Sequence, residues 1–160
     1  MARVYLSLGS NIDRAENIRS GLEALEREFG SLELSPVYES EAVGFDGEPF
    51  FNLVVALETD LSVGELADRL RRIENRHGRV RSERKYSSRT LDIDILTWGD
   101  RVGIIDGVEL PREEILKHAF VLRPLVDLAP EEQHPLLQRT YRELLEQADF
   151  SGQRLWKVSL

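Results

Sequence analysis

The short connection between two apolar segments is the feature that most constrains this fold. The segments "LELSPVYES" (32–40) and "FFNLVVALET" (50–59) both have strand character, and "VGFDGEPF" (43–50), with two Gly and one Pro, has the composition of a loop. Parallel strands need a longer crossover connection, so alternating βα units in a parallel sheet are disfavoured. The two strands are therefore expected to be antiparallel, and Pro36 predicts that the first is an edge strand or carries a bulge.

The apolar spacing along the rest of the chain adds two helices and two strands to this pair. In chain order they are a strand at 3–11, a helix at 14–29, a helix from Ser62, which forms a capping box with Glu65, to about Arg76, and a strand at 89–99. The resulting order, β-α-β-β-α-β, fits an α+β ferredoxin-like sandwich, an antiparallel sheet with helices packed on one face. A smaller appendix is expected to follow: a short strand and turn at 102–111, a helical turn at 112–117, a segment at 120–130 that begins as a strand, and a final helix at 141–148.

The composition limits the class of protein. The 160 residues suit one domain spanning 1–160, and the absence of cysteine excludes disulfides and favours a reducing compartment, the cytoplasm. No apolar run reaches the roughly 18 residues of a membrane span. The net charge of −8 argues against a general binder of nucleic acids or acidic membranes. Residues 76–89, however, hold six Lys or Arg and one Glu, which favours a local anionic ligand; the alternative is a solvated loop.

Two aspartates, Asp92 and Asp94, interrupt the apolar segment 89–99. Side chains at i and i+2 of a strand share a face, so both carboxylates point the same way, with Cα atoms about 6.6 Å apart. Oxygen ligands at this spacing suit Mg²⁺, and two such ions can bridge phosphate oxygens. The alternative is a pair of solvent-facing aspartates. Arg89, where the basic stretch meets the strand, favours phosphoryl transfer, because guanidinium groups suit the remaining phosphate oxygens.

Four pieces of sequence occur in a fixed order: "LSLGSN", "FFNLVVALET", "GRVRSERKYSSRTLDIDIL" and "AFVLRPLVDLAP". Together they resemble the 6-hydroxymethyl-7,8-dihydropterin pyrophosphokinase family of folate biosynthesis, and the third piece is close to a family signature. The resemblance implies the ferredoxin-like fold and transfer of the β,γ-diphosphate of ATP to the pterin hydroxymethyl group, with release of AMP. It also implies two Mg²⁺ ions. ATP and the hydroxymethyl dihydropterin are the expected partners of a monomer that binds neither nucleic acid nor membrane.

The resemblance also implies roles for individual residues. The implied catalytic residues are Arg79, Arg89, Asp92 and Asp94, with the two aspartates as Mg²⁺ ligands. The implied pterin-binding residues are the aromatics Phe50 and Phe120, which sandwich the ring, the amide of Asn52, and Ser40 and Val43. The implied ATP-binding residues are Glu74, Arg81, Lys85, Tyr86, Arg89, Ile95, Arg112 and His118, of which Arg81, Lys85 and Tyr86 match a mobile loop that closes over ATP. The alternative for the two Phe residues is core packing at the starts of strands.

Arg112 and His118 depart from the family pattern, in which His and Arg often occupy these two places. The details of nucleotide contact are therefore open, and a packing or surface role is the alternative for His118. His134, before Pro135, is expected in a surface loop. Two alternatives also stand for the whole chain. One is an RNA-binding module, since ferredoxin-like sheets with exposed aromatics bind RNA; the other is a paralogue that binds ligand without catalysing.

Overall fold

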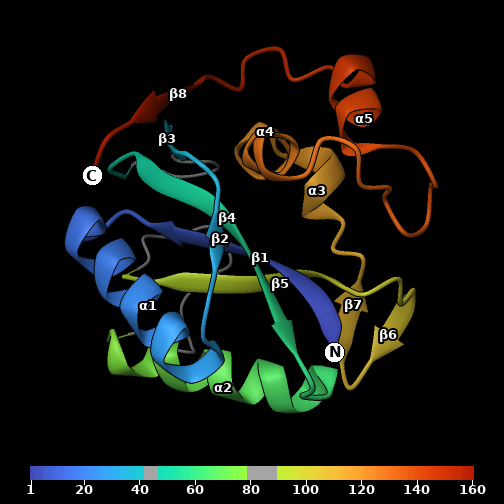
Figure 1. The fold of residues 1–160 in the computed structure, drawn as a ribbon. Coiled ribbons are helices and arrows are strands. Elements are labelled where there is room, and N and C mark those ends of the chain that lie inside the picture. The colour runs from blue at the N-terminus through green and yellow to red at the C-terminus, as the bar shows by residue number, and fades with distance from the viewer. Residues whose placement is uncertain (42–46, 79–89) are drawn as a thin grey trace.

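Six strands form the main sheet of the computed structural model, which describes residues 1–41, 47–78 and 90–160. They are β1 (Ala2–Ser10), β2 (Glu33–Leu34), β3 (Val37–Ser40), β4 (Phe50–Thr59), β5 (Asp92–Trp98) and β8 (Leu155–Val158). Their order is β5-β1-β4-β3-β8, with β2 added beside β4, and the pairings are antiparallel (Figure 1). The expected antiparallel pairing of 32–40 with 50–59 is confirmed, and so is the α+β class.

One face of the sheet is covered by α1 (Arg14–Phe29) and α2 (Val63–Arg76), which bury apolar side chains against β1, β4 and β5 (Figure 1). The predicted capping box starts α2: Ser62 Oγ accepts from the backbone N–H of Glu65 at 3.2 Å, and the Glu65 carboxylate accepts from Ser62 N at 3.0 Å. Both predicted helices are confirmed. This face therefore forms as the apolar spacing of the sequence predicts.

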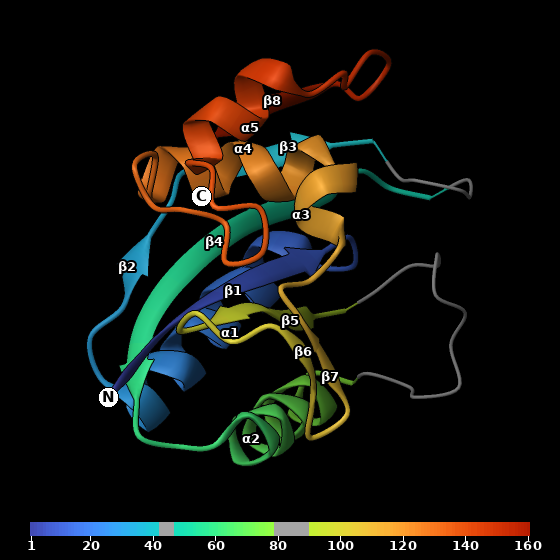
Figure 2. The same cartoon turned by 90° about the vertical axis from the view of Figure 1, so that its right-hand side faces the viewer.

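The opposite face is covered by α4 (Ala119–Leu128), with the short helices α3 (Glu114–Lys117) and α5 (Tyr141–Gln147) beside it (Figure 2). Two expectations are wrong here: the segment 120–130 begins as a helix, not a strand, and helices lie on both faces of the sheet. The buried side chains of α4 follow helical spacing and include Val121, Leu122, Leu125 and Val126. Their burial against β4 outweighs the strand preference of the valines and the presence of Pro124 within the helix.

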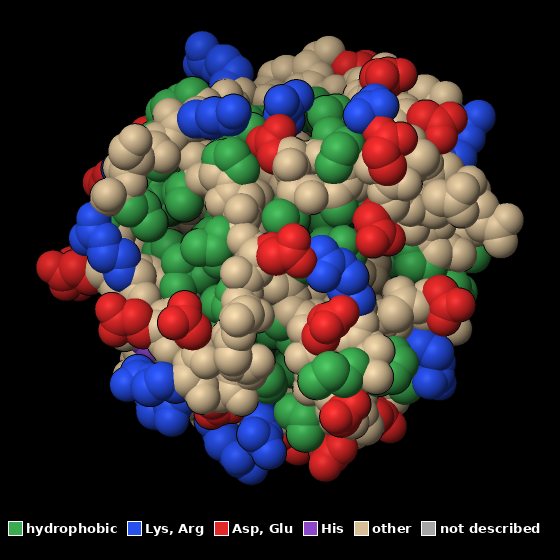
Figure 3. All heavy atoms as spheres, in the orientation of Figure 1, with side chains coloured by type: hydrophobic (Ala, Val, Ile, Leu, Met, Phe, Trp, Pro, Cys, Tyr) green, Lys and Arg blue, Asp and Glu red, His purple; other side chains and the backbone are tan. Residues whose placement is uncertain are grey.

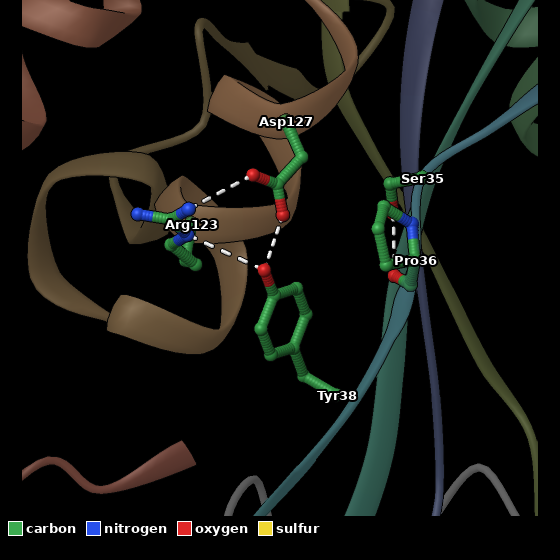
Figure 4. Close-up of polar contacts among 5 residues, drawn as sticks. All are labelled: Ser35, Pro36, Tyr38, Arg123 and Asp127. Atoms are coloured by element: carbon green, nitrogen blue, oxygen red, sulfur yellow. Dashed lines mark hydrogen bonds and ion pairs between the residues drawn. The ribbon is translucent and has the colours of Figure 1, made fainter. Parts of the chain in front are cut away.

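The interruption between β2 and β3 falls at Pro36, which has no N–H to donate to the ladder. Ser35 replaces part of the lost pairing. Its backbone N–H donates to the carbonyl of Val54 at 2.9 Å, and its Oγ accepts from the N–H of Val54 at 2.9 Å. Ser35 is buried, and its hydroxyl lies beside Pro36 (Figure 4). The irregular strand predicted from Pro36 is confirmed.

Two shorter features complete the described chain. A hairpin of β6 (Gly103–Ile105) and β7 (Val108–Leu110) matches the strand and turn expected at 102–111. β8 was not expected, because its four residues carry a weak pattern and owe their strand form to pairing with β3. Among the described helices, none is long and apolar enough to cross a membrane.

The coverage of both sheet faces bears on the alternative of an RNA-binding module. Modules of that kind stack bases on an exposed sheet face. Here the two faces carry α1 with α2 and α4 with α5, respectively. On the face of the molecule in Figure 3, Asp and Glu side chains are interspersed with Lys and Arg, in keeping with the net charge of −8. Helices on both faces of the sheet do not favour an RNA-binding module.

Candidate active site

One row of residues crosses three strands where the candidate site lies. Gly9 of β1 pairs with Asn52 of β4 on one side and with Asp92 of β5 on the other. Neighbouring strands lie about 4.8 Å apart, so the backbones of Asn52 and Asp92 are separated by about 10 Å. Directly paired residues share a face of the sheet, and glycine has no side chain to fill the space between them. The residue expected to bind the pterin edge and a residue expected to bind metal therefore flank Gly9 on this face.

Asp92 and Asp94 share this face, while Ile93 and Ile95 are buried in the core on the other face, as the alternation predicts. Burial, and after it the charge of Asp92, raise the pKa of Asp94 well above its usual range. Arg112 opposes this effect from a distance of 3.5 Å between its Nη2 and Asp94 Oδ1. Two carboxylates in such surroundings fit a divalent cation, because the cation turns their mutual repulsion into attraction.

The aspartate pair supplies only part of a metal coordination shell. Within residues 1–41, 47–78 and 90–160, no group of three or more His, Cys, Asp or Glu side chains is placed to hold a metal ion. Mg²⁺ usually keeps several waters and is held by one or two carboxylates together with substrate phosphates. The donor set therefore fits Mg²⁺ that is bound with a polyphosphate.

A cavity of about 170 Å³ adjoins the aspartates and is lined by residues of α2, β5, β7 and by Arg112. Glu74 of α2 is buried in its wall, and its carboxylate accepts the backbone N–H of Ile93 at 2.7 Å. Because β5 lies at the edge of the sheet, this bond satisfies a backbone donor on the outer side of the strand. Glu74, Ile95 and Arg112, three of the residues expected at the ATP site, thus line one cavity beside the expected metal ligands.

The polar part of the expected pterin site is a buried pair, Asn52 and Ser40. Asn52 is 7% exposed, and its Nδ2 donates to Ser40 Oγ at 2.9 Å. Phe50 lies two residues before Asn52 in β4, so its side chain is on the same face, and it pairs with Ser40 of β3. Three of the expected pterin-binding residues are therefore brought together at one end of the β3–β4 ladder.

Phe120 comes to this side of the sheet from α4, as the second residue of that helix and not from a strand start as expected. Its ring stacks on the imidazole of His118, with 4.7 Å between the centroids and 12° between the planes. The structure therefore places His118 against an expected pterin-binding residue, which agrees with the packing alternative. Its expected contact with ATP stays a prediction.

Residues 5–130 match the family model described as 7,8-dihydro-6-hydroxymethylpterin-pyrophosphokinase, HPPK. The chain belongs to the HPPK family. The family resemblance predicted from the sequence is thereby confirmed.

Curated relatives agree with this family membership over nearly the whole chain. The chain is 41% identical to the 2-amino-4-hydroxy-6-hydroxymethyldihydropteridine pyrophosphokinase of Pseudomonas aeruginosa over 154 residues, which cover 94% of each protein. It is 35% identical to the protein of the same name from Aquifex aeolicus over 145 residues, covering 89% of this chain and 90% of that one.

Among solved structures, wild-type HPPK-DHPS of Plasmodium falciparum with SDX-DHP superposes with a TM-score of 0.72 over 91% of this chain. The sequence identity is 16%, so this likeness concerns the fold alone. The chain covers 43% of that longer protein, less than half of its length. The HPPK fold expected from the resemblance is confirmed by this match.

The resemblance to the HPPK family assigned no role to the Gly-Ser-Asn that ends "LSLGSN", yet the structure gives two of these residues definite partners. Ser10 Oγ donates to the carbonyl of Thr90, and Asn11 Nδ2 donates to the carbonyl of Glu48 at 3.0 Å. Both side chains are buried, at 0% and 4% exposure. These two bonds attach the end of β1 to the segment that precedes β5 and to the segment that precedes β4. Two polar residues at the end of an apolar segment were the sequence signal for this anchoring role.

Several residues that the HPPK resemblance implicates lie outside the described residues. They are Val43 of the pterin set and Arg79, Arg81, Lys85, Tyr86 and Arg89 of the catalytic and ATP sets. The expected mobile loop falls in the same part of the chain. In the sequence, Ser40 and Phe50 flank the first of these segments and Asp92 follows the second.

Proposed function

We propose that this member of the HPPK family transfers the diphosphate of ATP to 6-hydroxymethyl-7,8-dihydropterin, giving AMP and the pterin diphosphate in folate biosynthesis. The observation that carries the proposal is the pairing of Asn52 and Asp92 with one residue, Gly9. A pterin whose edge is bound by Asn52 can extend its hydroxymethyl group across Gly9 toward the aspartates, over a span of about 10 Å. Phosphates bound at the aspartates then lie beside the attacking group.

The reaction needs one bond to form and one to break. The hydroxymethyl oxygen attacks the β-phosphorus of ATP and loses its proton, and the bond from that phosphorus to the oxygen bridging to the α-phosphate breaks, so that AMP leaves. The protein contributes mainly positioning and electrostatic stabilisation. Two Mg²⁺ ions held by Asp92 and Asp94 would neutralise the charge of the β- and γ-phosphates. Asp92, which pairs with Gly9, would orient the substrate hydroxyl.

The other site residues are supported either by the geometry of the structure or by the family resemblance alone. Geometry supports Ser40, Asn52, Phe50 and Phe120 as the pterin site, and Glu74, Ile95 and Arg112 as walls of the ATP site. Resemblance alone supports Val43, Arg79, Arg81, Lys85, Tyr86 and Arg89. We also propose that residues 1–160 form one pyrophosphokinase domain that works as a monomer in the cytoplasm.

The test is incubation of the purified chain with ATP, Mg²⁺ and 6-hydroxymethyl-7,8-dihydropterin, followed by separation of the nucleotides. The expected products are AMP and the pterin diphosphate in equal amounts, with no AMP when the pterin is omitted. The matched control is Asp94→Ala, which should retain the fold and form no AMP. Formation of ADP in place of AMP would indicate transfer of one phosphate and would overturn the proposal.

A further inference from the structure

Three polar side chains, those of Tyr38, Arg123 and Asp127, join β3 to α4 (Figure 4). The phenol of Tyr38 donates to the carboxylate of Asp127. Arg123 Nε donates to Tyr38 Oη at 3.3 Å, and Arg123 Nη2 donates to Asp127 Oδ1 at 3.1 Å. The three groups thus close a triangle. Tyr38 is only 4% exposed, whereas the side chain of Arg123 is 44% exposed, so the triangle joins the buried interface to the surface of α4.

The triangle lies directly beside the proposed pterin site. Tyr38 pairs with Asn52 in the β3–β4 ladder, and Ser40, the hydrogen-bond partner of Asn52, follows two residues later on the same face. On the helix, Phe120 precedes Arg123 by three residues and Asp127 by seven, a spacing that puts all three on one side of α4. Each end of the triangle is therefore next to one wall of the pterin site.

The register of β3 is what directs Tyr38 toward α4. Leu34 of β2 pairs with Val55, whereas Tyr38 of β3 pairs with Asn52, so the β2–β3 segment holds one residue more than the matching part of β4. If the same residues paired with β4 in regular register, without a bulge, Val37 would lie opposite Asn52. A bulge of one residue exchanges the two faces of the strand that follows it. The bulge at Ser35 and Pro36 thus brings a phenol to α4 in place of a valine.

We propose that Tyr38, Arg123 and Asp127 are positioning residues that fix the distance between Phe120 on α4 and the Asn52–Ser40 pair on the sheet, and so the width of the slot that holds the pterin ring. This inference rests on the proposed function. Apolar contacts alone are not directional, and they leave a helix some freedom to shift along a sheet. A gap that opens by 0.5–1 Å already forfeits about a quarter to a half of a dispersion contact, so ring stacking depends on this distance.

The variant Tyr38→Phe removes the hydroxyl that the other two side chains share and leaves the ring in place. The matched control is Tyr5→Phe. Tyr5 is likewise 4% exposed and packs in the apolar cluster between the sheet and α4, but its hydroxyl bonds Glu132 and not a residue of α4. Tyr38→Phe is expected to raise the pterin dissociation constant about tenfold, measured with a saturating non-hydrolysable ATP analogue and Mg²⁺. The KM for pterin should rise more than kcat falls.

In the same experiment the affinity for the ATP analogue should change less than about twofold in both variants, and Tyr5→Phe should leave pterin affinity unchanged. A second pair of variants tests the geometry: Asp127→Asn keeps an acceptor for Tyr38 and should recover most of the pterin affinity that Asp127→Ala loses. If the wild-type protein forms AMP but Tyr38→Phe and Tyr5→Phe bind pterin with equal affinity, the positioning role of Tyr38 is overturned and the proposed function is not. A wild-type protein that forms no AMP would instead overturn the proposed function.

Discussion

Arg112 lies between two acidic side chains, with its Nη2 3.5 Å from Asp94 Oδ1 and its Nε 3.0 Å from Glu114 Oε2. Its charge is therefore shared, and it balances the aspartate pair only in part. Asp92 and Glu74 add further negative charge around Asp94 and raise its pKa. A divalent cation brought in with a polyphosphate would enter a site that still has negative charge to neutralise.

The first prediction concerns the metal-free protein. Because the pKa of Asp94 is raised in the folded state, the native protein binds this proton more tightly than the unfolded chain does. Stability is then lost as pH rises from about 4 through the folded pKa, and the ionised carboxylate destabilises the fold above that range. Asp94→Asn should raise the melting temperature of the metal-free protein, by about 2–4 °C for each 1 kcal/mol gained in the free energy of unfolding. It should also abolish AMP formation.

The control for this prediction is Asp100→Asn, at an exposed position just after β5, which should leave both readouts as in the wild type. A variant at Asp94 that melts lower than the wild type and keeps its activity would show that this carboxylate is a structural partner of Arg112 and not a metal ligand.

The second prediction concerns the pterin edge. Asn52→Ala leaves Ser40 without its amide partner and removes the donor and acceptor expected to meet the pterin. Pterin binding should weaken by about 1–3 kcal/mol, the cost of leaving buried polar groups unpaired. Binding of an ATP analogue should change little. Calorimetry with each ligand separates the two effects, with Asn17→Ala in α1 as the control. Equal losses for both ligands would mean that the variant disturbs the fold.

The third prediction concerns the strip between the two sites. A Cβ added at Gly9 would lie 2.9 Å from Asn52 Oδ1, closer than side chains tolerate, and 3.6 Å from Phe50 Cδ1. Gly9→Ala should therefore displace Asn52 and lower pterin affinity about tenfold or more. Gly64→Ala is the matched control, because its Cβ would meet the Asp106 side chain at 3.1 Å, away from the site. If Gly9→Ala binds pterin as tightly as Gly64→Ala and the wild type do, the position of the Asn52 amide does not determine pterin affinity.

The fourth prediction concerns His134, which is 2% exposed and not a surface residue as expected. Its Nδ1 accepts the backbone N–H groups of Leu136 and Leu137 at 3.2 and 3.1 Å, and burial lowers its pKa. The neutral ring therefore stabilises the fold fully above the unfolded pKa of about 6.5, and this contribution is lost as pH falls toward the lower folded pKa. As the pH falls from about 7 to about 5, the melting temperature of His134→Asn should fall less than that of the wild type. NMR titration that places the pKa of His134 above about 6.5 would contradict this.

The two long helices and the strands β1, β4 and β5 could be predicted because each buries apolar residues, and the period of those residues distinguishes helix from strand. The expected paired orientation of Asp92 and Asp94 followed from the same alternation. The segment at 120–130 could not be assigned correctly, because a short apolar run fits a buried helix as well as a strand, and its partner, the second face of β4, is distant in sequence.

The individual residues of the candidate site could be predicted from the sequence, but their positions relative to one another could not. No local pattern shows that Asn52 and Asp92 would pair with one residue, since strand register depends on contacts between β1, β4 and β5. The stacking of His118 on Phe120 depends likewise on where α4 begins. The environment of His134 arises from two backbone donors within its own turn, which polarity alone does not reveal.

The bulge at Ser35 and Pro36 also limits how the length of this segment can change. The segment holds one residue more than the matching part of β4, so deleting one residue of the bulge would leave Tyr38 opposite Asn52, on the same face as before. Deleting two residues would place Tyr38 opposite Leu53 and turn its side chain away from the face that carries Asn52. The loss of one residue between β2 and β3 is therefore compatible with the pterin wall, whereas the loss of two would invert that wall while most of the sheet stayed intact.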